Sequence, residues 1–335
     1  MKSASHDGGA MNTPFLPAHR PGDKRGLQGI AYTFTVFTPT YNRADTLERA
    51  YESLRLQTYR DFEWLVVDDG STDRTQQLLT RWRAEATFPI RCIYQENQGK
   101  HVAYNRAVAE ARGAFLMPLD SDDACVPQTL ARLKYHWDNI QEHLREGFVA
   151  VTALCVDDTG RLVGTRFPQD VWDSDSLSAT YKYKVSGDKC GFQRTAVLRE
   201  FPMPGPEVGK SAIPEGLVWF RIARKYKTRF VNEALLINFR SEDSLSRPRY
   251  PQTNAVGAEL YNRTQLNDNI DYLADAPLEF LKSAANFARF SFHLRRSPAN
   301  QYHALTNWRA KALWLLALPI GATAYALDPV PVPHR

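Results

Sequence analysis

Short apolar runs alternate with helical patterns over the first half of the chain. The runs that predict strands are rich in β-branched and aromatic residues and cover 34–37, 64–67, 90–94 and 114–117. Between these runs, apolar residues recur at helical spacing, as in the stripe that begins at Leu47. Four strand–helix repeats in about ninety residues favour an α/β fold with a mostly parallel central sheet and helices on both faces.

The second half of the sequence is less regular. Its pattern predicts strands over 148–156 and 228–239 and a short helix over 217–225. Residues 202–216 read as a loop, because prolines and glycines interrupt them throughout. From 259 to 296 the apolar spacing is helical again, which predicts a helical C-terminal part.

Composition narrows the class of protein. The chain has 335 residues, 43% of them hydrophobic, and a net charge of +5, which is ordinary for a globular protein and too weakly basic for a dedicated nucleic-acid binder. The four cysteines show no C-x-x-C pair, so we expect neither a zinc site of the usual spacing nor a disulfide framework. A reducing, cytoplasmic environment fits this pattern. Residues 1–30 are rich in Gly, Pro and polar residues and predict a disordered tail without a signal peptide.

One long apolar run lies near the end of the sequence, at 312–327. It has 16 residues, includes Pro319, and is shorter than the roughly 20 residues of a membrane span. Trp308, Arg309 and Lys311 precede it, and tryptophan with basic residues beside a short apolar segment is typical of a membrane interface. The segment therefore predicts either a helix packed on the rest of the protein or a peripheral membrane contact.

Polar residues follow three of the predicted strands. The densest group is Asp120-Ser-Asp122-Asp123, in which carboxylates repel one another unless they are solvated or share a cation. Oxygen ligands of this kind favour Mg²⁺ or Mn²⁺, and the alternative is an acidic turn that caps the next helix. Asp68-Asp69 follows the second strand and could also be a helix cap. Tyr41 follows the first strand, where its ring could stack on a planar base or simply pack in a loop.

The motifs of other phosphate-binding protein classes are absent from the sequence. The sequence contains no G-x-x-x-x-G-K-[ST] and no G-x-G-x-x-G after the first strand, which argues against P-loop ATPases and dinucleotide-dependent dehydrogenases. A receiver domain would need its acidic pair after the first strand, whereas Asp68-Asp69 follows the second. A basic residue before a helix remains at Gly99-Lys100, and Lys100 could reach a phosphate or be solvated.

Four motifs, taken in order, closely resemble the family 2 glycosyltransferases. They are Thr38-Pro-Thr-Tyr-Asn-Arg43, Val66-Val-Asp-Asp-Gly-Ser-Thr-Asp73, Asn97-x-Gly99…Asn105 and Leu119-Asp-Ser-Asp-Asp123. The resemblance covers roughly residues 34–240. It implies a GT-A fold and an inverting enzyme that uses a nucleotide-diphospho-sugar donor with Mn²⁺ or Mg²⁺.

The resemblance also implies roles for single residues. Those that would hold the nucleotide-sugar are Thr38, Pro39, Tyr41, Asp69, Lys100, Asp120 and Asp122. Of these, Asp69 would accept a hydrogen bond from a base nitrogen, which favours a UDP-sugar. The metal would be held by Asp122 and Asp123.

The family's general base corresponds to Glu215. Family members often carry Glu-Asp at the start of a helix in the second half, whereas this sequence has Glu215-Gly216, which leaves one carboxylate. A helix start tends to keep a carboxylate ionised. Glu215 could instead only cap the helix, and Asp188 is the second candidate for the base.

These inferences combine into an expected organisation and function. We expect the tail to be followed by a catalytic domain over 31–245, with a nucleotide-binding half over 31–135 and an acceptor half over 136–245, and by a helical extension over 246–335. The expected reaction is sugar transfer to a hydroxyl of a glycan or lipid-linked acceptor in cell-surface polysaccharide or glycolipid synthesis. A sugar-nucleotide nucleotidyltransferase and an inactive glycan-binding scaffold are the alternatives.

Overall fold

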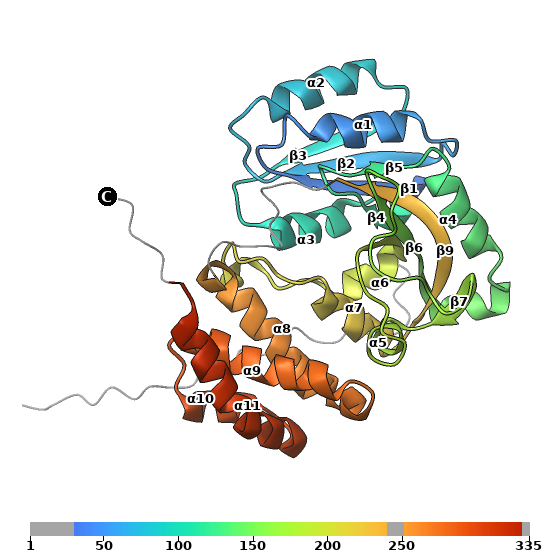
Figure 1. The fold of residues 1–335 in the computed structure, drawn as a ribbon. Coiled ribbons are helices and arrows are strands. Elements are labelled where there is room, and N and C mark those ends of the chain that lie inside the picture. The colour runs from blue at the N-terminus through green and yellow to red at the C-terminus, as the bar shows by residue number, and fades with distance from the viewer. Residues whose placement is uncertain (1–29, 240–250, 330–335) are drawn as a thin grey trace, which may run out of the picture.

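The computed structural model describes residues 30–239 and 251–329, which form a mixed α/β domain and a group of helices beside it (Figure 1). The predicted tail, apart from residue 30, and the predicted boundary near residue 245 lie outside the described residues. The strands are β1 (Tyr32–Thr40), β2 (Phe62–Asp68), β3 (Ile90–Tyr94), β4 (Gly113–Pro118), β5 (Ala124–Cys125), β6 (Phe148–Asp157), β7 (Val171–Ser174), β8 (Lys189–Arg194) and β9 (Lys227–Asn238). The α-helices are α1 (Leu47–Arg55), α2 (Thr75–Glu85), α3 (Lys100–Glu110), α4 (Thr129–Asp138), α5 (Ser176–Tyr181), α6 (Thr195–Glu200), α7 (Gly216–Ala223), α8 (Ala255–Asp268), α9 (Pro277–His293), α10 (Pro298–Ala304) and α11 (Trp308–Leu327).

The strands of the described residues form one sheet in the order β3-β2-β1-β4-β8-β6-β9-β5, with β7 paired to β9. Strands β3, β2, β1 and β4 are parallel, as the strand–helix repeats predict. Strand β8 runs antiparallel to β4 and β6, and β5 and β7 run antiparallel to β9. Strands β6 and β9 pair in parallel, so the sheet is mixed overall, and the four-stranded parallel part is the half that carries the acidic motifs.

Two hydrophobic cores cover the two faces of the sheet. On one face, α1, α2 and α4 pack through residues such as Leu54, Trp82 and Leu133. On the other face, α3, α6 and α7 pack through residues such as Ala107 and Val218. Every residue of β2 is buried, as expected for a parallel strand covered on both sides.

A third core belongs to the C-terminal helices. It joins α8, α9 and α11 to α5 and α7, with Phe280, Phe287 and Trp314 among its buried side chains. The helical pattern predicted over 259–296 is interrupted, because a short 3-10 helix at Ile270–Ala274 separates α8 from α9. Helix α9 then begins at Pro277, which suits a first helical position because proline has no backbone N–H to donate. Helix α7 is thus held between the sheet and the helical group.

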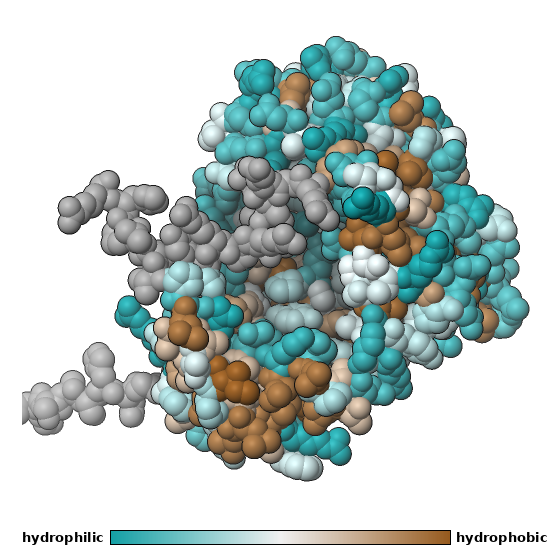
Figure 2. Space-filling view, viewed as in Figure 1, coloured by the Kyte–Doolittle hydropathy of each residue, from teal (hydrophilic) through white to brown (hydrophobic). Residues whose placement is uncertain are grey.

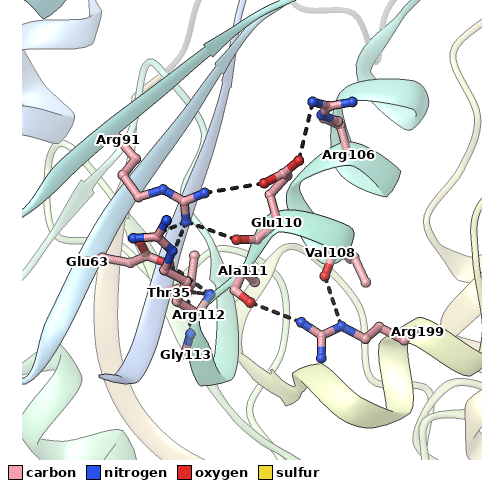
Figure 3. A network of polar contacts seen from close by, with 10 residues as sticks. All are labelled: Thr35, Glu63, Arg91, Arg106, Val108, Glu110, Ala111, Arg112, Gly113 and Arg199. Carbon is pink, nitrogen blue, oxygen red and sulfur yellow. Dashed lines mark hydrogen bonds and ion pairs between the residues drawn. The ribbon is translucent and has the colours of Figure 1, made fainter. Parts of the chain in front are cut away.

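A buried ion pair links the N-terminal ends of the central strands (Figure 3). The carboxylate of Glu63, on β2, is fully buried and accepts hydrogen bonds from the Thr35 hydroxyl at 2.7 Å and from the Arg112 backbone N–H at 2.9 Å. The Arg91 guanidinium lies 3.1 Å from the same carboxylate and donates to the Glu110 carbonyl at 2.9 Å. These contacts join β1, β2, β3 and the start of β4 at the end of the sheet opposite the acidic motifs.

Replacing Glu63 by Gln should lower the free energy of unfolding by about 2–4 kcal/mol, because it removes the buried charge that faces Arg91 and leaves only the partly exposed Glu110 carboxylate, at 3.4 Å, to pair with the guanidinium. Chemical denaturation measures the change. The matched control is Glu85→Gln, whose exposed carboxylate lies 3.9 Å from Arg81 and should change stability by less than about 0.5 kcal/mol. Equal effects of the two substitutions would contradict a stabilising role for the buried pair.

Candidate functional site

The carboxyl ends of three neighbouring parallel strands meet at one edge of the sheet. Thr40 at the end of β1 lies beside Asp68 at the end of β2, and β4 on the other side of β1 leads directly into Asp120. Ligands of open α/β sheets bind at this edge, where the chain leaves successive strands in different directions. A cleft of about 1610 Å³ opens here and extends towards the C-terminal helices.

Most of the residues singled out from the sequence line this cleft. They are Pro39, Tyr41, Asp69, Lys100, Asp120, Asp122, Asp123, Asp188 and Glu215. Thr38 does not belong to the lining. Its side chain is buried in the sheet and accepts a hydrogen bond from the indole N–H of Trp64 at 2.9 Å, so the expectation that Thr38 lines a base pocket does not match its position.

Asp69 holds the segment that leads into α3. One carboxylate oxygen accepts hydrogen bonds from the Gln95 side chain at 2.8 Å and the Gln98 backbone N–H at 2.9 Å. The other accepts from the Gly99 backbone N–H at 2.8 Å. This places Lys100, the next residue, at the mouth of the cleft. Two carboxylate oxygens offer about four acceptor positions, so one remains for the base nitrogen that the sequence assigns to Asp69.

The acidic motif after β4 is crowded. Asp123 is buried, and its oxygens accept hydrogen bonds from the Asn238 side chain at 2.8 Å and the Phe239 backbone N–H at 3.1 Å. Burial, together with the charges of Asp120 and Asp122, raises the pKa of Asp123 to about 7 despite these hydrogen bonds.

A divalent cation fits this motif. A cation among these carboxylates would offset their mutual repulsion, and the donors are oxygens of the type that Mg²⁺ and Mn²⁺ prefer. In the part of the chain that the structure describes, no three acidic, histidine or cysteine side chains converge as a closed metal cage. The motif is therefore suited to an ion held by one or two carboxylates together with substrate phosphates.

Lys100 connects the acidic motif to the predicted base. Its ammonium nitrogen lies 2.9 Å from Asp120 Oδ1 and 3.3 Å from Glu215 Oε1. Burial acts to lower the pKa of Lys100, but the two carboxylates outweigh it and raise the pKa above its ordinary value. Lys100 is thus a permanent positive charge between a residue of the first half of the chain and one of the second half.

Glu215 immediately precedes α7, yet its side chain makes no capping hydrogen bond. The carboxylate instead reaches Lys100, so the capping alternative does not describe it. The glycine that follows also has a structural cause. A Cβ on Gly216 would lie 3.1 Å from the ring of Tyr261 on α8, so a second acidic side chain here would require that ring to shift. Tyr104, a buried side chain whose hydroxyl has no partner among the described residues, has its pKa raised by burial and by the charge of Glu215.

Comparison with known proteins identifies the segment that carries these motifs. The model of glycosyl transferase family 2 matches residues 35–179, which include the motifs at the ends of β1, β2 and β4. Residues 35–179 are a family 2 glycosyltransferase domain. Glu215 lies beyond the matched residues, so its role is argued from the cleft alone.

Individual relatives agree with this family. An uncharacterized glycosyltransferase of Nostoc sp. (strain PCC 7120) is 39% identical over 30% of this chain and 31% of its own length. The poly(ribitol-phosphate) β-N-acetylglucosaminyltransferase TarS of Staphylococcus aureus is 29% identical over 53% of this chain and 30% of its own length. The chain thus spans about a third of these two relatives. A crystal structure of TarS residues 1–349 in complex with UDP-GlcNAc superimposes with a TM-score of 0.56 at 22% identity, covering 88% of this chain and 81% of that one, and both share the GT-A fold.

Two glycine-containing loops form the rim of the cleft beside β8. Gly164 and Gly187 both have positive φ angles, and a Cβ on Gly164 would lie 2.1 Å from the Ser186 carbonyl oxygen. The Thr165 backbone N–H donates to that same carbonyl at 3.1 Å, and the Ser186 N–H donates to the Thr165 hydroxyl at 2.9 Å. Asp188, the second candidate for the base, is exposed on this rim.

Among the cleft residues that the sequence did not single out, two contact the acidic motif. Asn238 and Phe239 extend β9 to the acidic motif, where both donate hydrogen bonds to Asp123. Asn238 Oδ1 and Thr40 Oγ1 are buried and have no hydrogen-bond partner among the described residues. For Asn238 the available signal was a polar residue near the end of the strand predicted over 228–239, whereas Phe239 contacts Asp123 through its backbone N–H, which no side-chain pattern marks.

Proposed function

We propose that this glycosyltransferase moves a sugar from a nucleoside-diphospho-sugar, with UDP as the preferred nucleotide, to a hydroxyl acceptor with inversion at the anomeric carbon. The observation that carries the proposal is the arrangement of the cleft. The acidic motif Asp120–Asp123 lies on one side of the cleft, and the carboxylate of Glu215, which does not cap α7, lies on the other. The ammonium of Lys100 lies between them.

The donor side is assigned to the ends of β1, β2 and β4. Tyr41 is 46% exposed in the cleft, where its ring can lie against a nucleobase. We assign contacts with the nucleotide-sugar to Asp120 and Asp122, and contacts with the metal to Asp122 and Asp123. A bound Mg²⁺ or Mn²⁺ would act as a Lewis acid for the charge that develops on the leaving diphosphate.

The acceptor side is assigned to Glu215. An acceptor oxygen attacks the anomeric carbon from the face opposite the diphosphate, and the bond to the diphosphate breaks with its electron pair. The acceptor proton passes to a carboxylate oxygen of Glu215, as in inverting reactions that use one general base. The cleft continues past Glu215 to the rim at Asp188, which leaves room for an extended acceptor.

The acceptor class is proposed from the relatives. The name of the S. aureus relative describes transfer of N-acetylglucosamine to poly(ribitol phosphate), a polymer that carries hydroxyl groups. We infer by analogy that this chain acts in the synthesis of a cell-surface polysaccharide or glycolipid, on a glycan or lipid-linked hydroxyl.

The test is a screen of UDP-, GDP- and dTDP-sugars for metal-dependent hydrolysis and transfer. The proposal expects slow release of the nucleoside diphosphate in the presence of Mn²⁺ or Mg²⁺ and faster release with a hydroxyl acceptor. Formation of a nucleotide-sugar from a nucleoside triphosphate and a sugar phosphate would favour a nucleotidyltransferase. Binding without turnover for every donor and candidate acceptor would favour a scaffold.

We further propose a peripheral membrane contact through α11. Its inner face is fixed to α9, because a Cβ on Gly321 would lie 2.4 Å from the Ala285 carbonyl oxygen. Its end is fixed by Asp328, which lies 2.7 Å from both Arg289 Nε and His293 Nε2. Although α11 has the length and composition of a possible span, these contacts hold it along the surface of the protein.

The outer face of α11 is apolar (Figure 2). Its large exposed side chains are Trp308, Leu315, Leu316, Ile320, Tyr325 and Leu327. The helix contains no acidic residue, and its two charged residues, Arg309 and Lys311, both lie in the first turn. Exposed apolar residues along roughly 30 Å, with an aromatic residue near each end and only positive charge, fit the surface of an anionic bilayer. All four cysteines are free thiols, which suits the cytoplasmic side of such a membrane.

Leu316→Asp should remove binding to vesicles that contain phosphatidylserine, because it places a negative charge in the centre of the apolar face, where Leu316 is 74% exposed. Co-sedimentation at low and high salt measures the binding, which should weaken as salt rises. The matched control is Leu144→Asp, on the 3-10 helix Glu142–Gly147, which should bind as the wild type does. Equal binding of all three proteins, or a dimer that Leu316→Asp dissociates without any vesicle binding, would contradict the membrane contact.

A further inference from the structure

The ammonium of Lys100 is shared between the two halves of the proposed active site. It lies 2.9 and 3.2 Å from the two oxygens of Asp120 and 3.3 Å from Glu215 Oε1. The side chains of Lys100, Asp120 and Glu215 are 40%, 44% and 38% exposed, so all three can be reached from the cleft. The contact involves the residue proposed as the base and a residue proposed to bind the donor.

We propose that Lys100 is a positioning residue that couples donor binding to the release of Glu215. In the free protein, Lys100 holds Glu215 Oε1. When the donor binds, its diphosphate draws the ammonium away, and Glu215 Oε1 becomes available to the acceptor hydroxyl. This inference rests on the proposed function, and it adds an order of events within the same site.

The chemistry of lysine suits this exchange. Its ammonium has three N–H donors on a flexible stem, so it can change partners without a movement of the backbone. In the free protein these donors face Asp120 and Glu215. A diphosphate offers more negative charge than one carboxylate and would enter beside Asp120, which remains within reach of the same ammonium.

The backbone around Lys100 fixes where the side chain starts. Gly99 has a φ of +100° and its N–H is bound by Asp69, so the first residue of α3 is held beside the acidic motif. Glu215 is held on the other side by the start of α7, whose N–H groups at Val218 and Trp219 donate to the Glu215 carbonyl. Both side chains can move while their backbones remain in place.

A measurable consequence follows from linkage. If Glu215 competes with the donor for Lys100, then removing the charge of Glu215 must strengthen diphosphate binding, because the ammonium is no longer held. The effect must disappear when Lys100 is absent. A residue that only repels the diphosphate would act with or without Lys100, so the double variant separates the two explanations.

The test is calorimetry of UDP binding to the full chain with Mn²⁺ present. Glu215→Gln should bind UDP about 3–10-fold more tightly than the wild type, near the lower end of couplings between two sites because the groups are partly solvated. Lys100→Met should bind about 10–100-fold more weakly, through loss of charge-assisted hydrogen bonds. In the double variant, the change at Glu215 should alter affinity by less than about twofold relative to Lys100→Met.

The matched control is Glu207→Gln, which removes one negative charge from the segment that precedes α7. The carboxylate of Glu207 accepts a hydrogen bond from the Gly205 N–H. It should leave UDP affinity unchanged. Equal affinities of wild type and Glu215→Gln, or tightening that persists in the Lys100→Met background, would overturn the coupling while leaving the proposed function intact. A wild-type chain that binds neither UDP nor GDP would overturn the proposed function and the coupling with it.

Discussion

Glu215→Gln should lower kcat by about 10²–10⁴-fold while donor binding is retained. Glutamine keeps the size of the side chain and can still accept one hydrogen bond, but it cannot take the proton of an acceptor hydroxyl. Its contact with Lys100 becomes that of a neutral amide, which frees the ammonium for the diphosphate, and the proposed nucleotide contacts at the ends of β1, β2 and β4 do not involve Glu215. Steady-state kinetics with the donor identified in the screen would measure kcat and KM separately.

The control for this experiment is Asp188→Asn, because Asp188 also lines the cleft and is the second candidate for the general base. Asp188 is exposed on the rim, and we expect its substitution to reduce turnover far less than that of Glu215. A Glu215→Gln enzyme that retains more than about a tenth of wild-type kcat would contradict the assignment, since the smallest expected effect is about 10²-fold. Asp188 would then become the candidate.

Asp122→Ala should remove the dependence of UDP binding on Mn²⁺ or Mg²⁺. If a cation bridges the acidic motif and the diphosphate, UDP should bind the wild type about 10²-fold more tightly with Mn²⁺ than with EDTA, because such a contact contributes several kcal/mol. In the variant the two affinities should be equal. Calorimetry in both buffers gives the comparison, and Asp138→Ala, an exposed partner of Lys134 on α4, is the control.

Asp123→Ala should also remove the metal dependence, but with a second effect. Asp123 accepts hydrogen bonds from Asn238 and Phe239, so its loss should also lower the unfolding temperature, whereas Asp122→Ala should not. If metal dependence survives in Asp123→Ala, Asp123 only supports the end of β9 and Asp122 is the protein ligand. Equal UDP binding by the wild type with EDTA and with Mn²⁺ would contradict the metal site altogether.

The first half of the fold could be predicted because its signals are local. Each parallel strand is a short apolar run, and each is followed by polar residues that must emerge at the same edge of the sheet. This argument brings Tyr41, Asp69 and Asp120 together without any knowledge of tertiary contacts. The second half lacks such regularity, and the short strands β5 and β7 depend on pairing with β9, which lies far away in the sequence.

The hydrogen-bond partners of the side chains were harder to predict than their location at the edge of the sheet. The side chain of Thr38 is buried in the sheet, where its hydroxyl accepts a hydrogen bond from the indole N–H of Trp64. The next two residues, Pro39 and Thr40, line the cleft. The carboxylate of Asp69 accepts three hydrogen bonds from the segment before α3, and no sequence pattern predicts them. The contact between Lys100 and Glu215 joins residues more than a hundred positions apart, so only the folded chain shows it.

The contact between Gly164 and Gly187 bears on any attempt to exchange the loops at the rim of the cleft. Because a side chain at either position would collide with the opposite loop, the two loops are shaped as complementary halves. Exchanging one of them for the loop of another enzyme would leave its counterpart without a matching surface. Loop exchanges should therefore replace residues 160–167 and 184–189 together.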